Sequence, residues 1–211
     1  MKKIIDINQL KLIGEGTQKK VYQHPTNIDK VIKIMRTELV DKNGGILKQS
    51  RLRAHRQNGV YRQFRREVLQ YMQLCKNNFY SKDFNFPVET IYGFIETNQG
   101  LGLVTEKIYD LNHKRTISLE NLYKNKALEK KHIEALKRFF KQCEKLHVVF
   151  GEVNQAGIMY TESRNNIPEF VLVDGIGDKL FIPFRSISKT INSRYIHKIA
   201  HRISKELDLV L

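Results

Sequence analysis

The 211-residue chain carries 37 lysines and arginines against 22 aspartates and glutamates, which gives a formal net charge of +15. A hydrophobic fraction of 41% is enough to build a core for one domain or two small lobes. The charge favours acidic partners such as nucleotides, phosphorylated molecules, nucleic acid or an anionic membrane surface, and it does not choose among them.

Short patterns argue against three classes of protein. Cys75 and Cys143 lie far apart without a C-x-x-C pattern, which disfavours a disulfide framework or a zinc site and predicts buried thiols in a cytoplasmic protein. The N-terminus begins with basic residues as a signal peptide does, but Asp6 and Lys11 interrupt any apolar core. No apolar run is long enough to span a membrane, so we expect no transmembrane segment.

The stretch from Ile13 to Lys33 reads as three short strands joined by a glycine turn and a second short turn. Gly14 and Gly16 let the backbone approach an anion closely and offer N–H groups without a Cβ in the way. Lys33, one strand later, would place an ammonium beside that anion. We therefore predict a phosphate-binding element here.

The order of these parts matches the G-x-G-x-x-G-x-V and V-A-I-K patterns of the nucleotide-binding half of protein kinases, with Val21 at the valine. The third glycine of the pattern is replaced by Lys19. The simpler alternative is a plain hairpin turn followed by an edge-strand lysine whose head reaches solvent.

A basic segment extends from residue 36 to residue 66, and its part from about 36 to 60 reads as an insertion. It is either a solvated surface or a docking face for an acidic partner. Only Tyr61 and Phe64 are aromatic, so base stacking on single strands is poorly supported. Its cations are Arg36, Lys42, Lys48, Arg51, Arg53, Arg56, Arg62, Arg65 and Arg66.

A helix is predicted from Tyr61 to Cys75, with Phe64, Val68, Leu69 and Met72 on its apolar side. Glu67 lies next to this stripe. In a kinase-like arrangement it would pair with Lys33 and hold that lysine towards the α- and β-phosphates. The alternative is a local pair with a neighbouring arginine at helical spacing.

The clearest hairpin pairs Glu89–Thr97 with a second strand, Leu101–Ile108, across an Asn-Gln-Gly turn. The second strand ends at Glu106 and Ile108, where a kinase has the hinge whose backbone groups contact adenine. The first half is therefore predicted to be a strand-rich lobe, residues 1–108, with one helix.

The second half, residues 109–211, is predicted to be mostly helical. Ser118 can cap a helix over Leu119–Lys124, and Leu128–His147 is a long amphipathic helix that buries apolar residues including Phe139. Near the C-terminus, Arg194–Leu207 is a basic amphipathic helix. The length after residue 174 is too short for the helices that hold peptide substrates in full protein kinases.

The stretch VVFGEVNQAGIMY follows the long helix, at the place of the kinase catalytic loop. Glu152 falls at the catalytic aspartate and would act as the base in phosphoryl transfer. Asn154 falls at the loop lysine and could offer an amide oxygen. Gly157 falls at the metal-binding asparagine and has no side chain to bind magnesium.

A buried strand is predicted from Phe170 to Val173, followed by Asp174 and Gly175. Asp174 occupies the position of the D-F-G aspartate, which chelates the magnesium that bridges nucleotide phosphates. The alternative is a plain aspartate in a turn at the end of a strand.

These motifs together resemble the PhoP regulatory network protein YrbL family of small bacterial proteins. The resemblance rests on IGEGTQKKVYQHP with VIKI, on FRREVLQY, and on VLVDGIGDKLFIPF, and it extends from about residue 10 to residue 205. It implies a trimmed kinase-like fold and a place in a PhoP-controlled network. It does not imply a defined reaction or substrate.

We therefore expect an α+β, two-lobed protein-kinase-like fold with a minimal, mostly helical C-terminal lobe. The first functional hypothesis is a protein that binds ATP and Mg²⁺, with weak phosphoryl transfer to an unknown acidic acceptor or protein partner and a regulatory role. The second is a pseudokinase, a binding module without turnover. A third, a basic nucleic-acid-binding protein, has no base-reading motif behind it.

Overall fold

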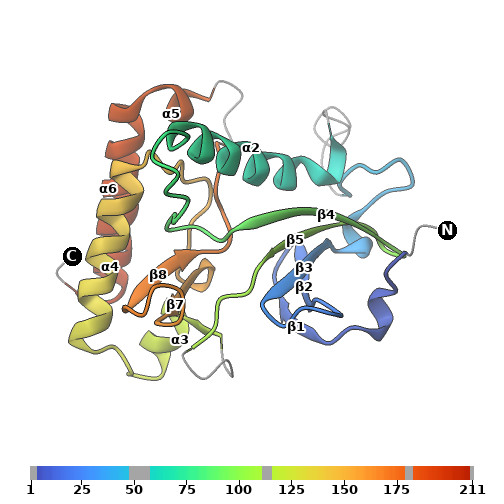
Figure 1. The fold of residues 1–211 in the computed structure, drawn as a ribbon, viewed down its shortest axis with the longest axis horizontal. Coiled ribbons are helices and arrows are strands. Elements are labelled where there is room, and N and C mark those ends of the chain that lie inside the picture. Colours follow the sequence, from blue (N-terminus) through green and yellow to red (C-terminus); the bar gives the residue numbers. More distant parts are fainter. Residues whose placement is uncertain (1–3, 48–57, 111–115, 179–182, 210–211) are drawn as a thin grey trace. The chain divides into compact units, whose positions relative to one another are not determined.

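A computed structural model of the chain describes residues 4–47, 58–110, 116–178 and 183–209 (Figure 1). The chain forms two compact units. Unit 1 comprises residues 1–68 and 90–107, and unit 2 comprises residues 69–89 and 108–211. The fold is mixed α+β, because unit 1 contains an antiparallel five-stranded sheet and unit 2 is more helical.

The sheet of unit 1 has the strand order β1-β2-β3-β5-β4, with every neighbouring pair antiparallel. The three strands near the N-terminus and the later hairpin are those that the sequence predicts. Three short 3-10 helices, η1 to η3, and the first part of helix α2 complete the unit. The bounds are η1 Ile7–Gln9, β1 Leu12–Glu15, β2 Lys19–Gln23, β3 Lys30–Met35, η2 Thr37–Leu39, η3 Gly59–Tyr61, α2 Arg62–Asn77, β4 Ile91–Thr97 and β5 Gly100–Glu106.

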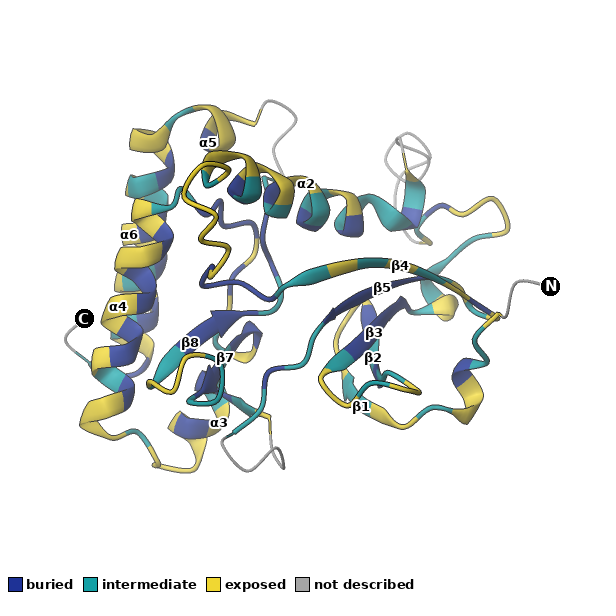
Figure 2. Ribbon diagram, in the orientation of Figure 1, coloured by how far each residue is buried: buried dark blue, intermediate teal, exposed yellow. Residues whose placement is uncertain are grey.

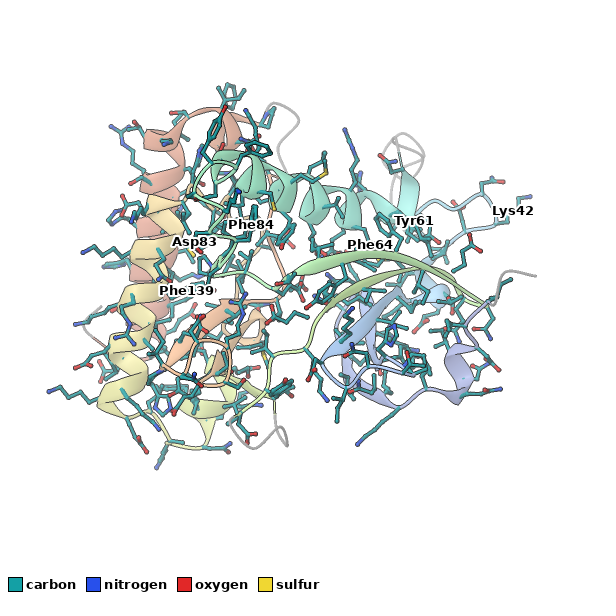
Figure 3. The ribbon with its side chains drawn as sticks, viewed as in Figure 1. Lys42, Tyr61, Phe64, Asp83, Phe84 and Phe139 are labelled. Atoms are coloured by element: carbon teal, nitrogen blue, oxygen red, sulfur yellow. The ribbon has the colours of Figure 1, made fainter. Side chains whose placement is uncertain are left out.

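Consecutive residues of strand β3 are buried. Because successive side chains point to opposite sides of a sheet, both faces of this strand are covered. Ile32 and Ile34 pack in one hydrophobic cluster, which also contains Ile7 from η1. Met35 packs on the other side in a cluster with Phe64 of α2. Lys33 therefore lies on the face that α2 covers. Phe64 of α2 (labelled in Figure 3) also contacts β4, because its ring centroid is 6.4 Å from that of Phe94.

Helix α2 buries a different stripe from the predicted one. Leu69 and Met72 are 51% and 59% exposed, so their predicted places on the apolar side are wrong. The buried positions include Glu67 and Gln70, each of which has a polar partner inside its own unit. A pattern of apolar residues cannot reveal such a face, because charged and amide groups stay buried only when their partners are present.

Part of the basic segment packs into the core of unit 1. Val60 is 4% exposed and packs with Val40 and Ile46, which are joined by an isolated β-bridge. Asp41 closes the intervening turn by accepting hydrogen bonds from the N–H groups of Asn43 and Gly45. The predicted cations Lys48, Arg51, Arg53 and Arg56 lie outside the described residues, so the docking role of this segment stays a prediction.

Over its described residues, unit 2 contains a three-stranded antiparallel sheet of order β6-β7-β8, the second part of α2, the helices α3, α4, α5 and α6, and one 3-10 helix (Figure 1). Helix α4 has a buried face that contributes to the core of unit 2 (Figure 2). Its Phe139 (labelled in Figure 3) belongs to this face. The Phe139 ring stacks on Phe150 with centroids 6.3 Å apart. The bounds are β6 Ile117–Ser118, α3 Leu119–Lys124, α4 Lys130–Lys145, the 3-10 helix η4 Gln155–Gly157, β7 Ile158–Thr161, β8 Glu169–Leu172, α5 Phe184–Ile187 and α6 Lys189–Glu206.

The predicted helices of the second half form, with one shifted start. Ser118 caps α3 by accepting a hydrogen bond from the N–H of Asn121 at 3.1 Å, as predicted. Helix α6 begins five residues before the predicted Arg194, because the hydroxyl of Ser188 caps it. This short-range signal was available in the sequence and was missed.

Candidate functional site

The glycine turn of unit 1 does not need glycine for its own conformation. The N–H of Gly16 donates to the carbonyl of Lys19 at 2.8 Å and closes the turn between β1 and β2. Neither Gly14 nor Gly16 has a positive φ. A Cβ added at Gly14 would lie 3.7 Å from Val21 Cβ, and one added at Gly16 would lie 3.6 Å from the Lys19 carbonyl oxygen, both ordinary contacts. The turn therefore leaves open the space that two Cβ atoms would fill.

Two buried lysines share one face of the sheet with Val21. Val21 is directly opposite Lys33 in the β2–β3 ladder, so the two side chains point to the same side. Lys19 is two residues before Val21 on β2 and therefore also points to that side. Lys33 is 3% exposed and Lys19 is 6% exposed. A buried lysine side chain is unusual in proteins, so two of them on one sheet face make this face a candidate binding site.

The carboxylate on this face belongs to Glu67 of α2. Its Oε1 accepts a hydrogen bond from Lys19 Nζ at 2.8 Å, and Glu67 is 1% exposed. The structure thus pairs Glu67 with Lys19, and the predicted Lys33–Glu67 pair stays a prediction. The register explains this: Lys19 lies opposite Met35, and Met35 packs with Phe64, one helical turn before Glu67.

The other oxygen of Glu67, Oε2, is buried and has no hydrogen-bond partner within the protein. A buried carboxylate oxygen is costly to leave unbonded. This oxygen is therefore a point at which a further donor would be favourable.

The predicted hinge residues have internal partners in unit 1. The Glu106 carboxylate accepts hydrogen bonds from the N–H and the hydroxyl of Thr90, both at 3.0 Å. The backbone N–H of Glu106 donates to the Thr90 carbonyl at 2.9 Å. An adenine contact through this N–H would therefore have to displace an internal hydrogen bond. Ile108 is 4% exposed and belongs to unit 2.

In unit 2, the loop after α4 and the segment after β8 are joined backbone to backbone. Gly151 N–H donates to the Gly175 carbonyl at 2.6 Å, and Gly177 N–H donates to the Val149 carbonyl at 2.8 Å. A Cβ at Gly175 would lie 2.2 Å from the Glu152 carbonyl oxygen, so this contact requires glycine. The two segments that carry the predicted chemistry therefore lie side by side.

Helix α6 fastens the same loop. The Tyr195 hydroxyl donates to the Gly151 carbonyl at 3.3 Å, and Arg202 Nη2 donates to the Val153 carbonyl at 2.5 Å. The side chain between these two carbonyls is Glu152, and this residue is exposed. Helix α6 thus fixes the backbone of Glu152 while its side chain faces solvent.

Asp174, Asn154 and Gly157 lie together at this junction. Asp174 follows β8 and accepts a hydrogen bond from Gly175 N–H through Oδ1 at 2.7 Å. A Cβ at Gly157 would lie 3.5 Å from Asp174 Cβ and 3.4 Å from Asn154 Oδ1. Asn154 uses that oxygen to cap η4 through Gly157 N–H at 2.9 Å. The amide of Asn154 therefore has a structural task that the sequence did not reveal.

A polar cluster around the buried Arg185 was not predicted from the sequence. The guanidinium of Arg185 contacts Asp178 at 2.7 Å and lies 4.3 Å from the centre of the Tyr195 ring. The His147 ring contacts the Arg185 carbonyl at 2.7 Å. Such clusters of paired charge and aromatic ring fix a loop in place. The sequence signal was the I-G-D run, whose partner could not be identified without the fold.

No group of three or more histidine, cysteine, aspartate or glutamate side chains able to hold a metal is present among the described residues. None of the helices in the described parts of the chain is long and apolar enough to cross a membrane.

Comparison with known proteins agrees with the resemblance inferred from the motifs. Two relatives share 24% identity with this chain over 190 residues, which is 88% of this chain and 80% of each relative. They carry the name Uncharacterized protein YrbL and come from Escherichia coli (strain K12) and Shigella flexneri. Residues 5–208 match the family described as PhoP regulatory network protein YrbL, and the chain therefore belongs to that family.

Proposed function

We propose that this protein has a protein-kinase-like fold, binds ATP together with Mg²⁺, and transfers phosphoryl groups weakly to an acidic acceptor. Gly14, Gly16 and Lys33, all in unit 1, are the proposed nucleotide-binding residues, and Asp174, in unit 2, is the proposed metal ligand. The observation that carries the proposal is the glycine turn followed by buried lysines on one sheet face.

The turn supports phosphate binding because the protein itself has no need of its two glycines. Gly14 and Gly16 adopt conformations open to other residues, and a Cβ at either would meet ordinary contacts. What a Cβ would obstruct is the close approach of an outside group to the backbone of the turn, whose Gly16 N–H is already bonded to the Lys19 carbonyl. Lys33 would then offer its ammonium to the phosphates from the neighbouring strands.

Asp174 fits a magnesium site of the type that nucleotides complete. Mg²⁺ is commonly held by one or two carboxylates together with substrate phosphates and water, without an all-protein cage. A single aspartate after a buried strand satisfies that requirement. When bound, the ion would neutralise charge on the phosphates.

Glu152 is the carboxylate that would accept a proton from an acceptor hydroxyl. Its backbone is held by the contact with Gly175 and by helix α6, and its side chain is exposed. A glutamate is one methylene longer than the aspartate usual at this position, which changes its reach to the hydroxyl. The basic surface would attract an acidic acceptor.

A second candidate is a pseudokinase that binds nucleotide without turnover. Gly157 favours it, because the position that supplies the second magnesium ligand in kinases has no side chain here. Losing one electrostatic contact to the transition state costs on the order of 3 kcal/mol, about a hundredfold in rate. Binding would survive such a loss.

The proposal is tested by thermal unfolding with ATP, with and without Mg²⁺. A ligand at 100 times its dissociation constant stabilises the native state by about 2.7 kcal/mol, which a melting curve detects. We expect Lys33→Ala and Asp174→Asn to abolish the Mg²⁺-dependent shift. Lys20→Met is the matched control, because Lys20 is half-buried and lies near the exposed Glu38 at 3.6 Å, on the opposite face of β2.

The outcomes separate the hypotheses. A shift with measurable ATP hydrolysis or autophosphorylation, both lost in Asp174→Asn, supports the enzyme, and a shift without turnover supports the pseudokinase. If the wild-type protein shows no shift with ATP, the proposal is wrong. Salt-dependent binding to duplex DNA that is unchanged by Lys33→Ala would then favour the nucleic-acid-binding alternative.

A further inference from the structure

We infer that Lys19 is a phosphate-binding lysine of the nucleotide site, held in place by Glu67. The inference rests on the proposed function and adds to it a residue that the sequence patterns leave out. Lys19 stands where the glycine-rich pattern has its third glycine. The sequence alone therefore suggested a defect in the motif at this position.

The position of Lys19 on the turn is the first argument. Its carbonyl accepts the hydrogen bond from Gly16 N–H at 2.8 Å that closes the turn. Its backbone is thus part of the glycine turn that the phosphates would approach. An anion bound at that turn would lie within the reach of a lysine side chain that begins there.

The anchoring of the ammonium is the second argument. Lys19 Nζ donates to Glu67 Oε1 at 2.8 Å, and the two side chains are 6% and 1% exposed. In kinases the conserved glutamate of the corresponding helix orients the lysine that contacts the α- and β-phosphates. Here the glutamate holds the lysine of β2, while Lys33 lies on the same face of β3.

The hydrogen-bonding capacity of the pair is the third argument. An ammonium has three N–H donors, and a carboxylate accepts through both oxygens. Glu67 Oε2 is buried and unbonded within the protein, so the carboxylate can accept another donor when the site rearranges around an anion. Charge-assisted hydrogen bonds from a lysine ammonium to phosphate oxygens are the strong ones in phosphate recognition.

The test compares affinities for ATP and adenosine, measured by calorimetric titration. Because Lys19→Met alone would leave Glu67 buried and unpaired, the main variant is the double substitution Lys19→Met with Glu67→Met, which removes both charges. Lys20→Met, one residue along the strand and on its other face, is the matched control. Far-UV circular dichroism and the melting temperature establish that each variant is folded.

We expect the double variant to bind ATP at least tenfold more weakly than the wild type and to bind adenosine with unchanged affinity. Lys20→Met should change neither affinity more than twofold. Adenosine is the decisive readout, since it lacks phosphates and a merely structural role of Lys19 would weaken both ligands alike.

Two results would overturn the inference while leaving the proposed function intact. One is a folded double variant that binds ATP as tightly as the wild type. The other is an equal loss of affinity for ATP and adenosine. A wild-type protein that binds neither ligand would instead overturn the proposed function itself, and this inference with it.

Discussion

Substituting Gly175 by alanine tests the junction between the loop after α4 and the segment after β8. Gly175 has a φ of +83°, and an added Cβ would lie 2.2 Å from the Glu152 carbonyl oxygen. Both obstacles are backbone features, so no side-chain rotation can relieve them. The two segments must separate, and the nucleotide-binding proposal depends on their staying together.

The expected cost follows from three contributions. A left-handed conformation costs an alanine about 1–2 kcal/mol. Moving the segments apart weakens two backbone hydrogen bonds, from Gly151 to Gly175 and from Gly177 to Val149, at about 1 kcal/mol each. The sum predicts that Gly175→Ala lowers the free energy of unfolding by about 3–4 kcal/mol.

Urea denaturation measures this difference, and Gly14→Ala serves as the matched control. Gly14 has no positive φ, and its added Cβ would meet Val21 at an ordinary 3.7 Å. The control should therefore stay within about 1 kcal/mol of the wild type, with stabilisation more expected than loss. If Gly175→Ala also stays within about 1 kcal/mol, the close packing of the two segments is wrong.

Three further predictions concern unit 2. Gly157→Asn would place an amide beside Asp174, where a Cβ meets only ordinary contacts. We therefore expect the rate of Mg²⁺-dependent ATP hydrolysis to rise above that of the wild type, with Gly157→Ala as the control. An unchanged rate in Gly157→Asn would contradict the idea that a missing metal ligand limits turnover. Hydrogen bonds from Ser193 and then His197 lower the pKa of Glu144. The stabilisation from ionised Glu144 is therefore present above its unfolded-state pKa and is lost as pH falls through the lower folded-state pKa. The difference in unfolding free energy between wild type and Glu144→Gln should shrink from pH 6 to pH 3, and a constant difference would contradict this prediction. Burial raises the pKa of the Cys143 thiol well above its usual range, so a thiol reagent at pH 8 should label Cys143 only after unfolding, and mass spectrometry showing rapid labelling of the folded protein would refute its burial.

Much of the fold was predictable because it depends on short-range patterns. The three N-terminal strands, the hairpin of β4 and β5, the cap of Ser118 on α3 and the long helix α4 all follow from local periodicity and turn residues. The start of α6 at Lys189 is marked by an equally local signal, the Ser188 cap, and was not predicted.

The buried stripe of α2 could not be predicted in this way. Leu69 and Met72 fit the apolar period and are exposed, whereas Glu67 and Gln70 are buried. Which face of a helix is buried depends on what packs against it. A polar side chain becomes acceptable inside only where a partner from a distant part of the sequence satisfies it.

By itself, the sequence determined that Gly14, Gly16, Lys33 and Asp174 stand in the order in which the kinase sequence patterns have their glycines, lysine and aspartate, because spacing is a property of the chain alone. Only the tertiary structure decided that Glu67 pairs with Lys19. That choice depends on the register between β2 and β3 and on which turn of α2 packs against Met35. These contacts join residues tens of positions apart, and no local pattern encodes them.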